Sequence, residues 1–192
     1  MALYPDYPIA TQRLRLRPFT RGDVDAVHAY RGREDVAEHL FDVALSREEC
    51  ALVLQQRIGQ VSWEAEGDKI ILAVDDAGGV LLGEVSLIWR SADARQAELG
   101  WIFHPDHHGR GYATEAASAL LDLAFGPGDM HRVYARCGVG NTASWRLMER
   151  LGMRREAHFR EHALFKGRWD EEYYYAILRH EWLGGRHPVL PG

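Results

Sequence analysis

The sequence predicts an α/β fold built on a largely antiparallel sheet, and three observations lead to this prediction. Three apolar runs between residues 69 and 104 alternate with polar positions and are joined by short polar turns, which is typical of antiparallel neighbours. An alanine-rich amphipathic stretch at 110–125 precedes an alternating run at 131–137, and this order favours a parallel strand–helix–strand crossover. Two long strand-like runs then occupy residues 153–182.

The N-terminal elements follow from local patterns. Residues 1–10 hold two prolines and are expected to form a loose lead-in, and leucine then alternates with arginine in a strand at 11–18. Helically spaced apolar residues predict a helix at 24–31, and a Ser-x-x-Glu capping box opens another at 46–61.

Glycine, proline and asparagine mark the later boundaries. Gly126-Pro127-Gly128 ends the helix at 110–125, and Asn141 caps a further helix that Gly152 stops. Lys166-Gly167 is the expected turn between the two final strands. Strands are therefore expected at 11–18, 69–74, 80–90, 96–104, 131–137, 153–165 and 168–182, and helices at 24–31, 46–61, 110–125 and 141–152.

Length and composition limit the class of protein. The chain has 192 residues, which suits a single domain over 1–192 with loose ends at 1–10 and 184–192. No apolar run approaches the ~20 residues of a membrane span, and the N-terminus lacks the features of a signal peptide. Two cysteines, Cys50 and Cys137, favour a reducing cytoplasm over a disulfide framework. The formal charge of −5 argues against a nucleic-acid partner and is compatible with a cationic substrate.

A glycine-containing turn lies between the strand ending at His104 and the helix at 110–125. Residues 108–113 are His-Gly-Arg-Gly-Tyr-Ala, so several backbone N–H groups at the helix start lack intrahelical partners. Gly109 and Gly111 let an anion approach closely, and the helix dipole adds partial positive charge. The turn is therefore a candidate phosphate site, and a plain strand-to-helix turn is the alternative. It is neither a Walker A loop nor a dinucleotide fingerprint, because the lysine of one and the third glycine of the other are missing.

The strand before this turn connects it to a carboxylate. By alternation, Leu99, Trp101 and Phe103 share one face, whereas Glu98 lies on the other face. Glu98 is roughly 20 Å from the end of the strand at ~3.3 Å per residue. A ligand with phosphates at the turn and a long flexible arm along the strand would place its reactive end near Glu98. A salt-bridge partner is the alternative role for this residue.

Four ordered segments carry a family resemblance. They are TQRLRLRPF (11–19), AELGWIFHPDHHGRGYATEAASALLDLAF (97–125), NTASWRLMERLGM (141–153) and KGRWDEEYYYAILRHEW (166–182). The chain resembles the GCN5-related N-acetyltransferase (GNAT) superfamily, and within it the RimJ/RimL-like branch of ribosomal-protein N-terminal acetyltransferases. The resemblance implies the GNAT fold, an α/β fold with a mixed, mostly antiparallel central sheet of about seven strands flanked by about four helices.

The same resemblance implies where an acyl-coenzyme A binds. The family's pyrophosphate loop, Gln/Arg-x-x-Gly-x-Gly/Ala, matches residues 108–113, with a histidine in place of the first residue, and Thr114 follows the loop. The implied phosphate contacts are His108, Gly109, Arg110, Gly111, Tyr112, Ala113 and Thr114. The pantetheine arm is implied to run beside Ile102, Phe103 and His104.

Asn141 and Ser144 match the family's Asn-x-x-Ser motif. By resemblance, Asn141 binds the cofactor arm, and Ser144 lies near the sulfur as a proton donor to the leaving thiolate. Asn141 is also a favoured N-cap residue, and the two roles are compatible. Because many relatives carry a tyrosine near the sulfur, Tyr134 and Tyr174 stay open as alternatives to Ser144.

The implied reaction is direct acyl transfer from acetyl-CoA to an amine, with coenzyme A as product. A base must take a proton from the ammonium group, and Glu98 matches the glutamate that often acts as base in the family, with His104 as the alternative. A main-chain N–H near Phe103 is the expected oxyanion donor. The implied acceptor is a protein N-terminus or a small amine such as a polyamine or aminoglycoside. Its pocket is implied to come from about 20–61 and 160–172.

Other functions stay open at this point. Another acyl group such as succinyl can replace acetyl, and a non-catalytic acyl-CoA-binding or regulatory domain is the competing function. No metal is expected, because His104, His107 and His108 lack further ligands at metal-binding spacing. No membrane or nucleic-acid partner is expected, and the oligomeric state is open between a monomer and the homodimers that are frequent among relatives.

Overall fold

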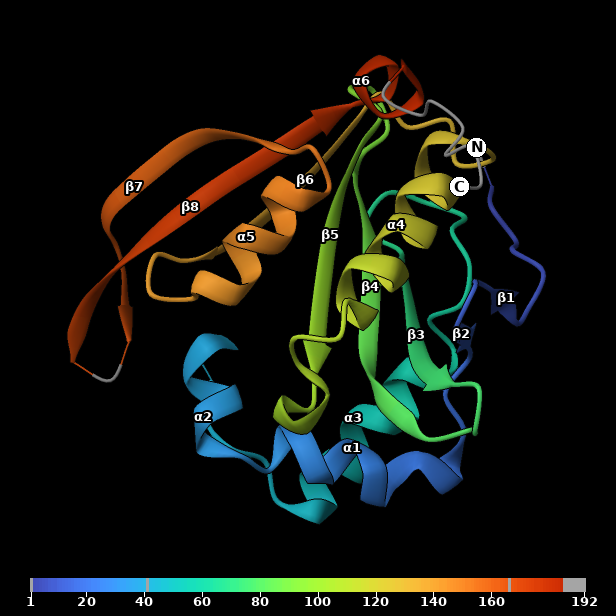
Figure 1. Ribbon diagram of the computed structural model, residues 1–192, viewed down its shortest axis with the longest axis vertical. Coiled ribbons are helices and arrows are strands. Elements are labelled where there is room, and N and C mark those ends of the chain that lie inside the picture. The colour runs from blue at the N-terminus through green and yellow to red at the C-terminus, as the bar shows by residue number, and fades with distance from the viewer. Residues whose placement is uncertain (1, 41, 166, 185–192) are drawn as a thin grey trace.

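The computed structural model describes residues 2–40, 42–165 and 167–184, and one central sheet organises it (Figure 1). In this described part, eight strands follow the spatial order β1-β2-β3-β4-β5-β6-β8-β7. Neighbouring strands are antiparallel, except that β5 and β6 are parallel as the crossover predicted. The strands are β1 (Ile9–Ala10), β2 (Leu14–Arg17), β3 (Lys69–Asp76), β4 (Leu81–Ser91), β5 (Gln96–Phe103), β6 (Arg132–Gly138), β7 (Arg154–Phe165) and β8 (Arg168–Leu178).

Helices cover both faces of the sheet (Figure 1). The larger apolar cluster lies between the sheet, α4 and α5, and a smaller one lies between the sheet, α1 and α3. The helices are α1 (Val24–Arg31), α2 (Glu34–Ala37), α3 (Arg47–Ile58), α4 (Tyr112–Phe125), α5 (Thr142–Arg150) and α6 (Arg179–Gly184), with the 3-10 helices η1 (Arg21–Asp23), η2 (Glu38–Leu40) and η3 (Pro105–His107). No helix among the described residues is long and apolar enough to cross a membrane.

The fold class predicted from the sequence is confirmed, with more elements than expected. The described residues add the short strand β1 and the helices α2 and α6 to the expected set. The capping box at the start of α3 is present, since Ser46 and Glu49 each bind the main-chain N–H of the other. The sequence did not predict α2 or η2, because segments this short have no hydrophobic period.

The start of the chain is tied to the sheet rather than forming the expected loose lead-in. Leu3 is buried and exchanges two main-chain hydrogen bonds with Trp63 (2.8 and 2.9 Å). The Tyr7 hydroxyl donates to the carbonyl of Val61 (2.6 Å), and β1 pairs with β2. These long-range partners have no signature in the local sequence.

The end of the chain also differs from the prediction. The last strand stops at Leu178, and the four residues up to Trp182 that were expected to extend it belong to α6. The Glu181 carboxylate accepts from the main-chain N–H of Leu178 (2.8 Å), which fixes the helix start. Lys166 of the expected turn and the tail at 185–192 lie outside the described residues.

The parallel strands β5 and β6 pair only at one end. Their register runs from Gln96–Arg132 to Glu98–Tyr134, whereas β6 stays paired with β8 as far as Gly138. Figure 1 shows the two strands separating toward α2. The separation leaves one edge of β5 without a strand partner, and this edge borders the site described below.

Main-chain groups of Trp101 and Phe103 form this free edge. The N–H of His104 donates to the carbonyl of Leu82 on β4 (2.9 Å), and main-chain groups alternate in direction along a strand. The groups of Trp101 and Phe103 therefore point away from β4, into the gap left by β6. The predicted alternation of side chains is also present, because Phe103 packs into the α4 cluster and Ile102 against the α1–α3 cluster.

Candidate active site

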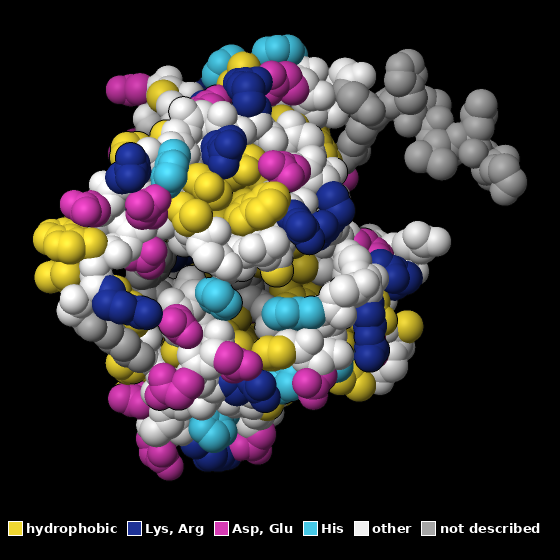
Figure 2. All heavy atoms as spheres, turned by 60° about the vertical axis from the view of Figure 1, so that its left-hand side comes forward, with side chains coloured by type: hydrophobic (Ala, Val, Ile, Leu, Met, Phe, Trp, Pro, Cys, Tyr) yellow, Lys and Arg dark blue, Asp and Glu magenta, His cyan; other side chains and the backbone are white. Residues whose placement is uncertain are grey.

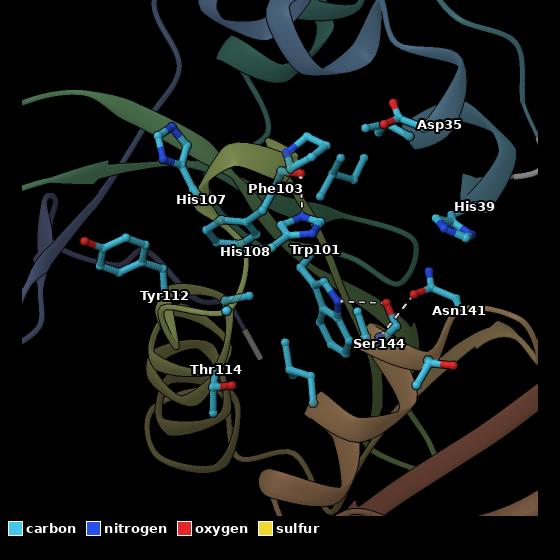
Figure 3. A pocket seen from close by; sticks show the side chains of 18 of the residues that line it. Asp35, His39, Trp101, Phe103, His107, His108, Tyr112, Thr114, Asn141 and Ser144 are labelled. Carbon is cyan, nitrogen blue, oxygen red and sulfur yellow. Dashed lines mark hydrogen bonds between the residues drawn. The ribbon is translucent and has the colours of Figure 1, made fainter.

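The gap between β5 and β6 holds a cavity of about 780 Å³. It is lined by the end of β5, the loop through η3, the first turn of α4, residues of α5 and the segment formed by α2 and η2. Figure 2 shows histidine side chains bordering a hollow on this face, and Figure 3 shows the side chains that line the cavity. Segments that are far apart in the sequence therefore converge here.

The glycine turn forms one end of the cavity. Gly109 and Gly111 have φ angles of +75° and +78°, which favour glycine, and Gly111 is the N-cap of α4. The first helical bond runs from the N–H of Glu115 to the carbonyl of Gly111 (3.0 Å), so the N–H groups of residues 112–114 have no helical acceptor. A Cβ at Gly109 would meet nothing within 4 Å. The turn is thus an open, N–H-rich cradle at a helix N-terminus, which fits a phosphate.

Two residues just before β2 hold the turn from behind. The Glu115 carboxylate accepts from the Thr11 hydroxyl (2.6 Å) and from Nε of Arg13 (2.7 Å). Nη1 of Arg13 also donates to the carbonyl of Arg110 (3.1 Å), and its guanidinium lies 4.9 Å from the centre of the Tyr112 ring. The N-terminal part of the sheet therefore fixes the junction between the turn and α4.

Arg150, which the sequence did not single out, brings a cation to the cavity. It is the last residue of α5, and its Nε lies 3.5 Å from the Thr114 hydroxyl in the first turn of α4. Arg110, the cation expected from the sequence, does not line the cavity. The two helices meet only in the folded protein, so no local pattern could have related Thr114 to Arg150.

His108 links the turn to the free edge of β5. Its Nε2 lies 3.1 Å from the carbonyl oxygen of Phe103 and donates to it in the tautomer that carries a proton on Nε2. The residue that departs from the Gln or Arg of the resembled motif therefore makes a polar contact of its own. This contact orders the loop against the strand beside the cavity.

Asn141 and Ser144 stand on the opposite wall, as Figure 3 shows. Oδ1 of Asn141 accepts from the N–H of Ser144 (3.1 Å), so Asn141 caps α5 and its amide N–H₂ group is left to face the cavity. Oγ of Ser144 accepts from Nε1 of Trp101 (3.3 Å), which leaves the hydroxyl proton for another acceptor. The geometry is compatible with both roles that the sequence suggested for Asn141.

Two substitutions at Asn141 separate the capping role from the ligand role. Asn141→Asp keeps an oxygen that caps α5 but removes the amide donor. We therefore expect unchanged stability and about tenfold weaker coenzyme A binding, which corresponds to the free energy of one neutral hydrogen bond. Asn141→Ala removes both groups and should also lose about 1 kcal/mol of unfolding free energy. Calorimetric titration with coenzyme A and urea unfolding measure the two effects. Equal stability losses in both variants would rule out the cap.

Glu98, the base expected by resemblance, lies outside the residues that line the cavity. It occupies the last position at which β5 and β6 pair. Its carboxylate accepts from Nε of Arg90 (2.8 Å), the Tyr134 hydroxyl (3.1 Å) and Nε of Arg136 (3.3 Å), and the side chain is 14% exposed. The structure therefore shows the salt-bridge role that the sequence left open for this residue. Catalysis by Glu98 stays a prediction, and it would require a water between the carboxylate and an amine in the cavity.

His104, Tyr134 and Tyr174 also lie outside the cavity lining. His104 accepts from the N–H of Asp106 through Nδ1 (3.2 Å) and so caps η3. The Tyr134 hydroxyl donates to Glu98, and the ring of Tyr174 stacks on that of Tyr134 at 6.2 Å between centres. These side chains therefore have structural partners, whereas Ser144 faces the cavity.

A second, smaller cavity of about 330 Å³ adjoins the first, between η2 and the β7–β8 hairpin. His39, Gly140 and Asn141 line both cavities. An exposed ion pair between Glu38 and Arg168 (3.1 Å) joins η2 to β8 at this place. The location agrees with the acceptor pocket that the resemblance implies, but its residues carry no motif.

Cys137 is a buried residue of β6. Burial raises the pKa of the Cys137 thiol to about 12, so it stays protonated near neutral pH and is a poor nucleophile. Within the described ranges, no group of three or more His, Cys, Asp and Glu side chains is arranged to hold a metal ion.

Comparisons with known proteins match this chain to acetyltransferases. A family model described as an acetyltransferase (GNAT) domain matches residues 13–154. The uncharacterized N-acetyltransferase YnaD of Bacillus subtilis (strain 168) is 33% identical over 174 residues, which are 91% of this chain and 98% of that protein. The crystal structure of a GNAT-family acetyltransferase from Bacillus anthracis superposes with a TM-score of 0.80 at 33% identity, covering 90% of this chain and 98% of that one. The spermidine N-acetyltransferase of Vibrio cholerae, solved in complex with CoA and spermine, superposes with a TM-score of 0.77 at 26% identity, covering 90% and 99%.

Proposed function

Because the chain belongs to the acetyltransferase (GNAT) family, whose enzymes use acetyl-CoA, we propose that it transfers an acetyl group from acetyl-CoA to a primary amine. One observation carries the proposal. A single cavity connects the N–H-rich turn at 109–114 with the amide of Asn141 and the hydroxyl of Ser144. This arrangement matches a ligand with phosphates at one end, a flexible arm and a thioester at the other end.

The residues of the cavity divide the binding of this ligand among them. The turn and Arg150 hold the pyrophosphate, through main-chain N–H groups and a positive charge. The free edge of β5 at Phe103 bonds the amides of the pantetheine arm as an added strand would, and Asn141 donates to the same arm. Ser144, oriented by Trp101, faces the sulfur.

Transfer begins when the acceptor ammonium group loses a proton to a base. The amine nitrogen then attacks the thioester carbonyl carbon, and a main-chain N–H on the free edge of β5 stabilises the oxyanion. As the C–S bond breaks, the Ser144 hydroxyl gives its proton to the thiolate and regains one from solvent. The ammonium group gives up two protons overall, of which one ends on the sulfur and one in solvent.

A small polyamine is the acceptor that we favour. The Vibrio cholerae relative is named for spermidine, and the second cavity has the carboxylate of Asp170 and the exposed ring of Trp169, groups that attract a cation, beside the Glu38–Arg168 ion pair. A protein N-terminus, as the RimJ/RimL-like resemblance implies, is the alternative acceptor. Both are primary amines and follow the same chemistry.

An acceptor panel tests the proposal. The purified protein is incubated with acetyl-CoA and spermidine, spermine, an aminoglycoside or a peptide with a free N-terminus, and thiol release is followed together with the product mass. We expect release with at least one amine and a product heavier by one acetyl group. Coenzyme A binding without release for any amine would favour a non-catalytic binding domain, and absence of coenzyme A binding would overturn the site.

A further inference from the structure

We propose that His39 is the general base that takes the proton from the acceptor amine. This inference rests on the proposed acetyl transfer and assigns its missing proton acceptor to η2 rather than to Glu98. His39 lines both cavities. No sequence pattern selects it, because it stands in a short turn without a motif.

The junction of the two cavities locates the reacting atoms. Asn141 is at the junction and bonds to Ser144, beside which the thioester sulfur is placed. The acceptor is proposed to lie in the second cavity, so its nitrogen meets the thioester carbon where the cavities join. The residues common to both cavities are His39, Gly140 and Asn141, and of these His39 alone has a side chain that can take up a proton.

The carboxylate and the other histidines that line the main cavity are engaged or distant. Both carboxylate oxygens of Asp35 accept from Arg33, at 2.9 and 2.8 Å. Nε2 of His108 is bound to the carbonyl of Phe103. His107 belongs to η3, on the far side of the turn from Ser144 in Figure 3, and burial lowers its pKa. The remaining cation is an arginine, which cannot lose its proton.

The imidazole of His39 is available for this task. It is exposed, and it forms no hydrogen bond or ion pair with the residues that the structure describes. Figure 3 shows it on the segment of α2 and η2, next to Asn141 in the view. Histidine is the side chain that ordinarily gains and loses its proton between pH 5 and 8, which suits base catalysis near neutrality.

Charged groups face His39 from two sides. Asp35 and Glu38 come from its own segment, and Asp170 and Arg168 from β8 line the second cavity with it. On the side of α5, the uncharged residues Asn141 and Ser144 line the cavity near the junction. The charged residue of this helix that lines the cavity is Arg150, at the other end of the helix. Two of these three carboxylates are engaged in ion pairs, Asp35 with Arg33 (2.8 Å) and Glu38 with Arg168 (3.1 Å).

The proton balance of the step is complete. A ring nitrogen of His39 uses its lone pair to take one proton from the acceptor ammonium group, and the freed amine lone pair forms the C–N bond. The C–S bond breaks and the sulfur takes the Ser144 proton. The imidazolium then returns its proton to solvent, and the second nitrogen proton reprotonates Ser144 through solvent.

The test compares H39Q, E98Q and H131Q as full-length proteins, with the acceptor that gives the highest turnover. Glutamine resembles histidine in size but cannot take a proton, and His131 provides a matched exposed histidine away from the cavity. We expect H39Q to lower kcat/KM about 10²-fold or more and to remove the acid limb of its pH profile, with unchanged coenzyme A affinity. H131Q should behave as the wild type. A weakly basic amine, already unprotonated at the assay pH, should reduce the H39Q deficit to less than about tenfold.

The outcomes separate this inference from the proposed function. If the wild type releases thiol but H39Q keeps its rate and acid limb, the inference is overturned and acetyl transfer stands. Loss of the acid limb in E98Q instead would assign the base to Glu98. A deficit in H39Q that is the same for weakly and strongly basic amines would also contradict proton transfer, because it would indicate a role in binding. A wild type that releases no thiol with any amine overturns the proposed function itself.

Discussion

Replacing Gly111 by valine is expected to weaken coenzyme A binding about ten- to hundredfold. Gly111 has a φ of +78°, in the left-handed region that a β-branched residue occupies only at a cost of roughly 1–3 kcal/mol. As the N-cap of α4, it also sets the direction of the N–H groups that form the phosphate cradle. Relief of the strain would rotate these groups away from the ligand. Calorimetric titration with coenzyme A measures the loss.

Gly79 supplies a matched control for this strain. It has a φ of +81° in the turn between β3 and β4, with open space around it, and it does not line the cavity. Gly79→Val therefore carries a similar backbone penalty away from the site, and should lower the melting temperature without changing coenzyme A affinity. If both variants lost affinity equally, the loss would reflect global destabilisation, and Gly111 would have no special part in the phosphate site.

The parts of the site that the sequence predicted are those encoded locally. The turn at 108–113 combines two glycines with the start of an apolar-striped helix, and the structure places that turn at one end of the cavity. Asn141 is predicted to be an N-cap because it comes directly before a helical pattern, and the structure contains this cap. In both cases a few consecutive residues determine the backbone geometry, so the feature can be predicted from one sequence alone.

The parts that were not predicted depend on contacts between distant segments. His39 and Arg150 reach the cavity only because η2 and α5 fold against the opening between β5 and β6. Glu98 was placed on the correct strand face, but its partners come from β4 and β6, and a pattern along one strand cannot show them. Spacing identifies which residues share a face, whereas charge pairing across strands requires the register.

A buried carboxylate between the sheet and the N-terminal helices illustrates the same limit. Glu84 lies in the middle of β4 and is almost completely buried. Its oxygens accept from the Tyr30 hydroxyl (2.7 Å) and from Nη2 of Arg31 (2.7 Å), and Arg57 of α3 donates to it as well. The cluster joins α1, α3 and β4 behind Ile102, which is the cross-strand neighbour of Glu84 on β5. It therefore supports the strand that carries the free edge of the site.

Replacing Glu84 by glutamine is expected to cost about 3–5 kcal/mol of unfolding free energy. The substitution keeps the shape of the side chain but leaves two buried guanidinium groups without a countercharge, which is the costly way to break a buried ion pair. This is a large part of the roughly 5–15 kcal/mol that stabilises an ordinary domain. Urea unfolding at neutral pH measures the loss. Asp25→Asn is the control, because the Asp25–Arg47 pair (2.6 Å) is exposed and its loss should leave the free energy of unfolding almost unchanged.

The pH dependence of this loss distinguishes a missing charge from poor packing. Burial alone would raise the pKa of Glu84, but the charges of Arg57 and Arg31 outweigh it and lower the pKa from the usual 4.5 to about 2. A carboxyl whose pKa is depressed by folding contributes stability that is complete above about pH 4.5 and is lost as the pH falls toward 2. The stability difference between wild type and Glu84→Gln should therefore be constant near neutrality and shrink by about 3 kcal/mol on acidification. A difference that stayed the same down to pH 3 would show that glutamine disturbs packing and that the charge of Glu84 contributes little.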